Sequence, residues 1–152
     1  MARPSIYEIA GGEDAFRALA AAHHARCLAD PLLEHPFSHG VSPDHVEHLG
    51  AYLAEVFGGP PRFSTAHGGH SAMLGIHANE EIGDEFGDRF VACFVAAADD
   101  AGLPEDPAFR AALAAYMRWA MDEVLTYSPP DATVSAGLPM PRWDWDGLVQ
   151  PA

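Results

Sequence analysis

The chain has 152 residues, of which 49% are hydrophobic, and this composition fits one compact domain with a full core. Its formal net charge is −14 and it contains no lysine, so a Schiff-base lysine is excluded as a catalytic group. Neither nucleic acid nor an anionic membrane surface is expected as a partner, because both bind through clustered positive charge.

Helical patterns follow one another along the chain. Ser5 and Glu8 form a capping pair for a first short turn, which Gly11-Gly12 ends. Apolar residues at three- and four-residue steps predict further helices. The predicted helical ranges are 5–10, 13–29, 42–57, 71–77, 80–101 and 106–127, with a loop over 62–70. Because no range shows the alternation of a strand, the fold class is predicted to be all-α.

The cysteines and the first residues of the chain indicate the cellular compartment in which the protein is expected. Cys27 and Cys93 lie inside apolar helical patterns, which favours buried free thiols of the kind found in a reducing compartment. The first residues do not form the apolar core of a signal peptide, and no apolar run is long enough to span a bilayer. We therefore expect a cytoplasmic protein.

Nine histidines are an unusual number for a chain with so few other basic groups. His45 and His48 are three residues apart on a predicted helix and could share a metal ion. A loop could bring His67 and His70 together in the same way. Histidines exposed to solvent are the favoured interpretation for His35, His39, His48, His67 and His70.

Two other histidine positions point to a pocket. His45 shares a helix face with Leu49 and Tyr52, so it is expected to point toward the core, where a polar ring needs a partner. His77 ends a short apolar segment, and Asn79 can cap the helix that follows. Such a corner suits a histidine that binds metal through one ring nitrogen, although a buried histidine bonded to backbone also fits. The candidates for a single pocket are His24, Phe37, His45 and His77.

Several short sequence features occur along the chain in a characteristic order. They are Gly11-Gly12, Asp30-Pro31-Leu32, Phe37, Gly58-Gly59-Pro60, Gly69-His70, and His77-Ala78 ahead of the aromatic Phe90. In this order they resemble the truncated haemoglobins, most like the second group of that family. The resemblance implies a two-over-two sandwich of helices around haem b over residues 1–130, with residues 131–152 as a C-terminal extension packed on the domain.

The resemblance also implies roles for single residues. His77 is the implied proximal ligand of the haem iron, and Phe37 is implied to pack flat against the haem. His45 would stand at the distal gate, with Leu49 and Tyr52 lining the distal wall. The bound ligand implied by these roles is dioxygen or another diatomic molecule.

Three positions depart from the family pattern. His24 stands where the family usually has a distal tyrosine, and Phe90 stands where the second group usually has a tryptophan. Ile76 replaces the arginine commonly found before the proximal histidine, and Arg62 is a possible substitute as partner of a haem propionate. Phenylalanine cannot donate a hydrogen bond to a bound ligand. The remaining candidate donors are His24, His45 and Tyr52.

Other functions stay open at this point. Peroxide or nitric-oxide chemistry would need electrons from a reductase partner, because the chain shows no flavin or nicotinamide motif. One alternative is a histidine-rich helical protein that binds non-haem metal through His45, His48 and nearby carboxylates. Another is an interaction module that uses the tail containing Trp143 and Trp145. For that tail, a strap packed on the helical body is preferred to a partner surface or a lid.

Overall fold

The computed structural model describes residues 3–34, 44–78 and 83–149, and of Ile76 and His77 it describes the backbone only. Helices dominate the described part of the chain, and the predicted all-α class is confirmed. The helices are α1 (Ile6–Ala10), α2 (Glu13–Ala29), α4 (His45–Val56), α5 (Arg62–His67), α6 (Gly69–His77), α7 (Asp84–Asp100) and α8 (Pro107–Thr126). A short antiparallel hairpin is formed by β1 (Trp143–Asp144) and β2 (Gly147–Leu148).

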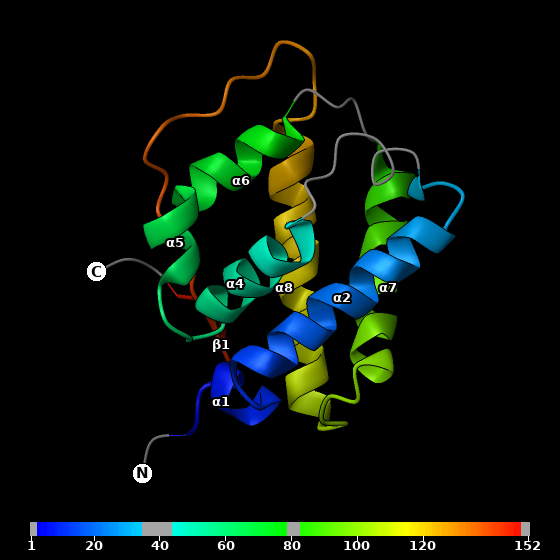
Figure 1. The fold of residues 1–152 in the computed structure, drawn as a ribbon. Helices are drawn as coiled ribbons and strands as arrows, with labels where there is room; N and C mark the ends of the chain where they lie inside the picture. Colours follow the sequence, from blue (N-terminus) through cyan, green and yellow to red (C-terminus); the bar gives the residue numbers. More distant parts are fainter. Residues whose placement is uncertain (1–2, 35–43, 79–82, 150–152) are drawn as a thin grey trace.

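The four longest helices form two packed pairs. α2 lies against α4, α7 lies against α8, and α2 also crosses α7, so that one pair stacks over the other (Figure 1). α5 and α6 lead from the end of α4 toward one end of α8 (Figure 1). The predicted two-over-two sandwich is therefore confirmed. Large side chains that fill the core between these helices include Phe16, Leu53, Phe94, Phe109 and Tyr116.

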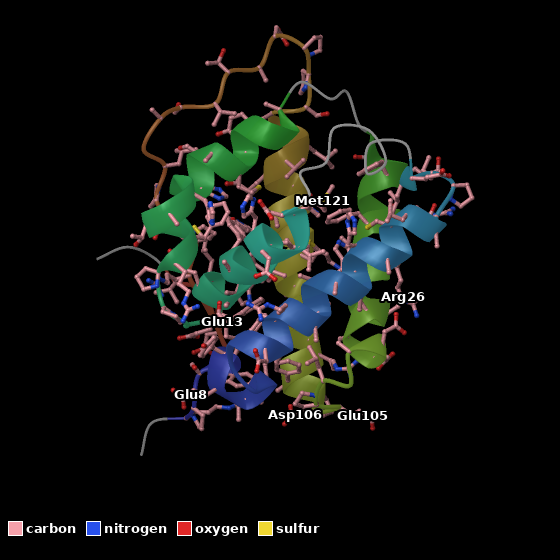
Figure 2. All side chains as sticks on the ribbon, viewed as in Figure 1. Glu8, Glu13, Arg26, Glu105, Asp106 and Met121 are labelled. Carbon is pink, nitrogen blue, oxygen red and sulfur yellow. The ribbon has the colours of Figure 1, made fainter. Side chains whose placement is uncertain are left out.

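Local signals explain where α1 and α8 begin. The Ser5 hydroxyl accepts a hydrogen bond from the Glu8 backbone N–H at 3.1 Å. At α8, the Asp106 carboxylate accepts from the Phe109 N–H at 3.0 Å, and Pro107 occupies the first turn. Figure 2 shows Asp106 at this end of the helix. Both helices begin where the sequence predicts them.

The predicted loop over 62–70 is wrong. This stretch contains α5 and the start of α6, which meet at Gly68 and Gly69 with φ of 87° and 77°. Glycine reaches such left-handed backbone without strain because it has no Cβ. The glycines that suggested a loop therefore form a tight corner between two short helices. The predicted helix starts at residues 42 and 80 lie outside the described residues.

Two arginine–aspartate pairs tie α2 to α7. Arg89 of α7 donates to both carboxylate oxygens of Asp30, at 2.8 and 3.0 Å. Arg26 of α2, labelled in Figure 2, pairs in the same two-pronged way with Asp100. Solvent screens such surface pairs, so they contribute little to stability, but their bidentate geometry fixes the direction of the two side chains. The pairs hold the histidine-bearing half of α2 in register with α7.

The C-terminal residues pack on the helices. Trp143 is 8% exposed, and its ring centroid lies 5.7 Å from that of Tyr116 and 6.0 Å from that of Trp119, both on α8. Trp145 is half-buried and reaches the N-terminal end of the chain. The division into a globin domain over 1–130 and an extension over 131–152 stays a prediction.

Candidate functional site

Two of the predicted pocket residues meet where α2 lies against α4. The ring centroids of His24 and His45 are 5.1 Å apart, and both side chains are half-buried. Burial lowers the pKa of His24, which favours the neutral imidazole with one donor and one acceptor nitrogen. Two candidate ligand-contacting histidines from separate helices thus lie side by side.

His23 is a buried histidine beside this pair that was not predicted as a site residue. It is 0% exposed, and its ring stands edge-on to Phe90 at 4.5 Å and to Phe94 at 5.3 Å. Its Nε2 lies 3.7 Å from the Sγ of Cys27. Burial lowers the pKa of His23 to about 3. The sequence signal was its place on the apolar face of α2, and that signal also fits an ordinary core residue.

Tyr52, predicted for the distal wall, is bonded to a histidine of α6. Its hydroxyl lies 2.9 Å from Nδ1 of His70, and both residues are 3% exposed. Nε2 of His70 lies 3.4 Å from a carboxylate oxygen of Glu123 on α8. The expectation that His70 is exposed to solvent is therefore wrong. α6 turns one face onto α4 and α8, and partners so distant in sequence leave no local pattern.

The structure pairs the histidine rings differently from the sequence prediction. The rings of His48 and His67 lie 4.1 Å apart, between α4 and α5, whereas His45 faces His24 and His70 faces Tyr52. His67 is exposed and His48 is half-buried. Among the described residues, no group of three or more histidine, cysteine or acidic side chains is arranged to hold a metal ion.

The other predicted site residues lie apart or are not described. Leu49 is partly buried on α4 and packs against the core. Arg62 has a 65% exposed side chain, and its Nη1 lies 4.0 Å from the Glu13 carboxylate of α2. Phe37 lies outside the described residues. For His77, the structure gives its backbone position as the last residue of α6.

This arrangement has a donor set that suits a haem iron. An imidazole is the usual proximal ligand of haem in globins, and α6 ends at one, His77. α2 and α4 present two further imidazoles in contact, His24 and His45, which can donate to a small polar ligand. The apolar ring of Phe90 contacts the ring of His23, which neighbours His24 in the chain. The described residues therefore include histidines of the kind that can hold a haem iron or donate to its ligand.

Comparison with known proteins matches residues 5–123 to a family model described as bacterial-like globin. The haemoglobin of the thermophilic phototroph Chloroflexus aurantiacus is 35% identical, with a TM-score of 0.68 over 80% of this chain and 98% of that one. The thermostable haemoglobin of the actinobacterium Thermobifida fusca is 30% identical, with a TM-score of 0.68 over 80% of this chain and 96% of that one.

A third solved structure is similar in fold alone. The group II truncated haemoglobin of Bacillus anthracis is 20% identical, with a TM-score of 0.68 over 82% of this chain and 92% of that one. No curated protein sequence matches the chain. Haemoglobins of the matched family carry haem b.

Proposed function

Because this chain belongs to the bacterial-like globin family, which includes the truncated haemoglobins, we propose that it binds haem b and holds dioxygen or another diatomic ligand at the haem iron. The observation that carries the proposal is the family match over residues 5–123 together with the contact between His24 and His45. When bound, haem supplies the iron that takes the ligand, and the chain tunes it.

The chain's own residues have separate parts in this proposal. His77, at the end of α6, is the proximal ligand, and Phe37 packs on the haem face. His24 and His45 donate hydrogen bonds to the bound ligand, since phenylalanine at position 90 cannot. Tyr52 lines the wall of the pocket through its ring, because its hydroxyl is engaged by His70.

The protein is proposed to work in the cytoplasm and to receive any electrons that it needs from a separate reductase. None of the helices in the described part of the chain is long and apolar enough to cross a membrane. Binding alone needs no electron donor, but turnover of peroxide or nitric oxide would draw electrons from a separate reductase.

The non-haem alternative has less support. It needs His45 and His48 to share a metal ion, yet their rings contact different histidines, His24 and His67. A colourless protein that retains metal would favour this alternative.

An absorption spectrum of the purified protein, followed by substitution of His77, tests the proposal. We expect an intense haem band in the near ultraviolet that is largely lost in His77→Gly and partly restored by added imidazole, which can fill the vacated ligand position. His67→Gly is the matched control, because His67 is exposed on α5 and should leave the spectrum unchanged. An unchanged spectrum in His77→Gly would show that another residue holds the iron.

A further inference from the structure

A row of hydrogen-bonded side chains joins α4, α6 and α8. The Tyr52 hydroxyl lies 2.9 Å from His70 Nδ1, and His70 Nε2 lies 3.4 Å from Glu123 Oε1. Tyr52 and His70 are each 3% exposed, whereas the Glu123 side chain is 34% exposed. This Tyr52–His70–Glu123 row therefore runs from the interior to the surface.

The partners of His70 fix the direction of the hydrogen bonds. The carboxylate of Glu123 can only accept, so the ring proton of His70 is assigned to Nε2, and Nδ1 accepts from the Tyr52 hydroxyl. Burial lowers the pKa of His70, against the opposing effect of Glu123, and burial raises the pKa of Tyr52 well above its usual range. The resting state is thus a neutral phenol donating to a neutral imidazole.

This geometry matters for oxidation of the phenol. A phenol that loses an electron becomes a cation, and an unpaired charge in a buried site is costly unless a proton leaves at the same time. His70 Nδ1 lies at hydrogen-bond distance to accept that proton. The carboxylate of Glu123 faces the other nitrogen and balances the charge of the imidazolium that forms.

Aromatic rings continue from the row toward the tail. The ring of Trp119 is stacked on that of His70 at 5.9 Å, and Trp143 lies 6.0 Å from Trp119. Tyr116 contacts both tryptophan rings, at 6.2 and 5.7 Å. Oxidisable tyrosine and tryptophan rings thus follow one another in contact from α8 to β1, and the first of them, Trp119, is stacked on His70.

We propose that Tyr52 is a redox-active tyrosine with His70 as its proton acceptor. The proposal rests on the proposed function, since the oxidant would be the one-electron oxidising equivalent that hydrogen peroxide generates at a bound haem. Tyr52 gives one electron to that oxidant and its hydroxyl proton to His70 Nδ1, which leaves a neutral phenoxyl radical beside an imidazolium. One electron from Trp119 then reduces the phenoxyl radical of Tyr52 while the imidazolium of His70 returns the proton, which leaves Trp119 as a cation radical.

The first experiment generates the oxidant without haem chemistry. A ruthenium–bipyridine photo-oxidant is coordinated to the exposed His67 of the full chain, in a His48→Gln background that leaves a single site in this ring pair. The ring of Phe63 bridges the label to its target, at 5.5 Å from His67 and 5.0 Å from Tyr52. Transient absorption after a flash reports the phenoxyl radical.

We expect the radical signal in the labelled chain and its loss in Tyr52→Phe. Tyr127→Phe, a half-buried tyrosine at the end of α8, is the control that should keep the signal. His70→Gln should slow radical formation about tenfold, the rate equivalent of about 1.4 kcal/mol. Ring-deuterated tyrosine in the unsubstituted chain should narrow the electron paramagnetic resonance spectrum, which identifies a tyrosyl radical even if a variant fails to fold.

The second experiment adds hydrogen peroxide to the haem-loaded chain and freezes it within milliseconds. The same Tyr52-dependent radical is expected there. A haem-loaded chain with no Tyr52 radical in either experiment would overturn this inference and leave the proposed function intact. A preparation without a haem band would overturn the proposed function, and the flash experiment would still decide whether Tyr52 and His70 act as a redox pair.

Discussion

At the residue scale, His23 links the stability of the fold to pH. Burial lowers its pKa to about 3 in the folded chain, against about 6.5 for an exposed histidine. Between these values only the unfolded chain binds the proton, so the free energy of unfolding falls as the pH falls, by up to about 1.4 kcal/mol per pH unit. Burial also lowers the pKa of His24 and His70, which acts in the same direction.

We predict that His23→Phe flattens this pH dependence. Phenylalanine keeps a ring against Phe90 and Phe94 but has no proton to bind. Urea unfolding at several pH values between 7 and 4, followed by circular dichroism, measures the slope. His67→Gln, on the exposed face of α5, is the control and should keep the slope of the unsubstituted chain. Equal slopes in all three proteins would show that His23 is not the group responsible.

The contact between His24 and His45 leads to a second prediction at the same scale, which depends on the proposed function. In His45→Leu, loss of a hydrogen bond to bound dioxygen, worth about 1.4 kcal/mol, should speed dioxygen release about tenfold. In His48→Leu the rate should change little, because the His48 ring contacts His67. Stopped-flow replacement of dioxygen by carbon monoxide measures both rates. Equal acceleration in the two variants would mean that the wrong face of α4 has been assigned to the pocket.

At the element scale, Gly50 sets how closely α4 approaches α2. A Cβ at this position would lie 3.3 Å from the Cα of Arg17 and 3.5 Å from the carbonyl oxygen of Phe16. We predict that Gly50→Leu lowers the free energy of unfolding by about 1–3 kcal/mol, because the two helices must move apart. Gly75→Ala in α6 is the comparison, since an added Cβ there meets no atom within 4 Å from the described residues outside its own stretch of helix.

Gly75→Ala should raise the free energy of unfolding by up to about 1 kcal/mol, through helix propensity alone. Urea unfolding of both variants provides the comparison. If Gly50→Leu were as stable as the unsubstituted chain, the close crossing of α2 and α4 would not be a constraint on the fold.

α5, α6 and α8 show which parts of the fold could be predicted from the sequence. The start of α8 follows from Asp106 and Pro107, because a cap and a first-turn proline act within four residues. The glycine corner between α5 and α6 could not be distinguished from a loop, since glycine favours both. The partners of His70 come from α4 and α8, so the periodicity along α6 could not predict them.

For the candidate site, the sequence predicted which residues share a helix face but not which side chains contact one another between helices. The shared face of His45, Leu49 and Tyr52 follows from helical periodicity, but only the structure shows that the Tyr52 hydroxyl is taken by His70. The resemblance to truncated haemoglobins supplied the register that placed His24 near His45. The roles of His77 and Phe37 stay predictions, and the absorption experiment tests that of His77.

At the scale of the whole molecule, the tail connects parts of the chain that are far apart in sequence. Near its start, the Ser71 hydroxyl of α6 donates to the Ser135 carbonyl at 2.8 Å and accepts from the Leu138 N–H at 2.9 Å. Near its end, Trp145 Nε1 donates to the Pro4 carbonyl at 2.9 Å. The tail lies beyond residue 123, where the family match ends, so the family match does not describe its contribution to stability.

We predict that the two tryptophans of the tail contribute very unequally. Trp143 is 8% exposed against Tyr116 and Trp119, and Trp143→Ala should lower the free energy of unfolding by about 3–5 kcal/mol because it leaves a large cavity. Trp145→Ala removes one hydrogen bond and the stacking of Arg3, whose guanidinium lies 3.6 Å from the ring centroid, and should cost about 1–2 kcal/mol. Urea unfolding of the full chain compares the two. Small and equal losses would mean that the tail folds independently of the helical body, whereas the predicted difference would make β1 part of the same core as α8.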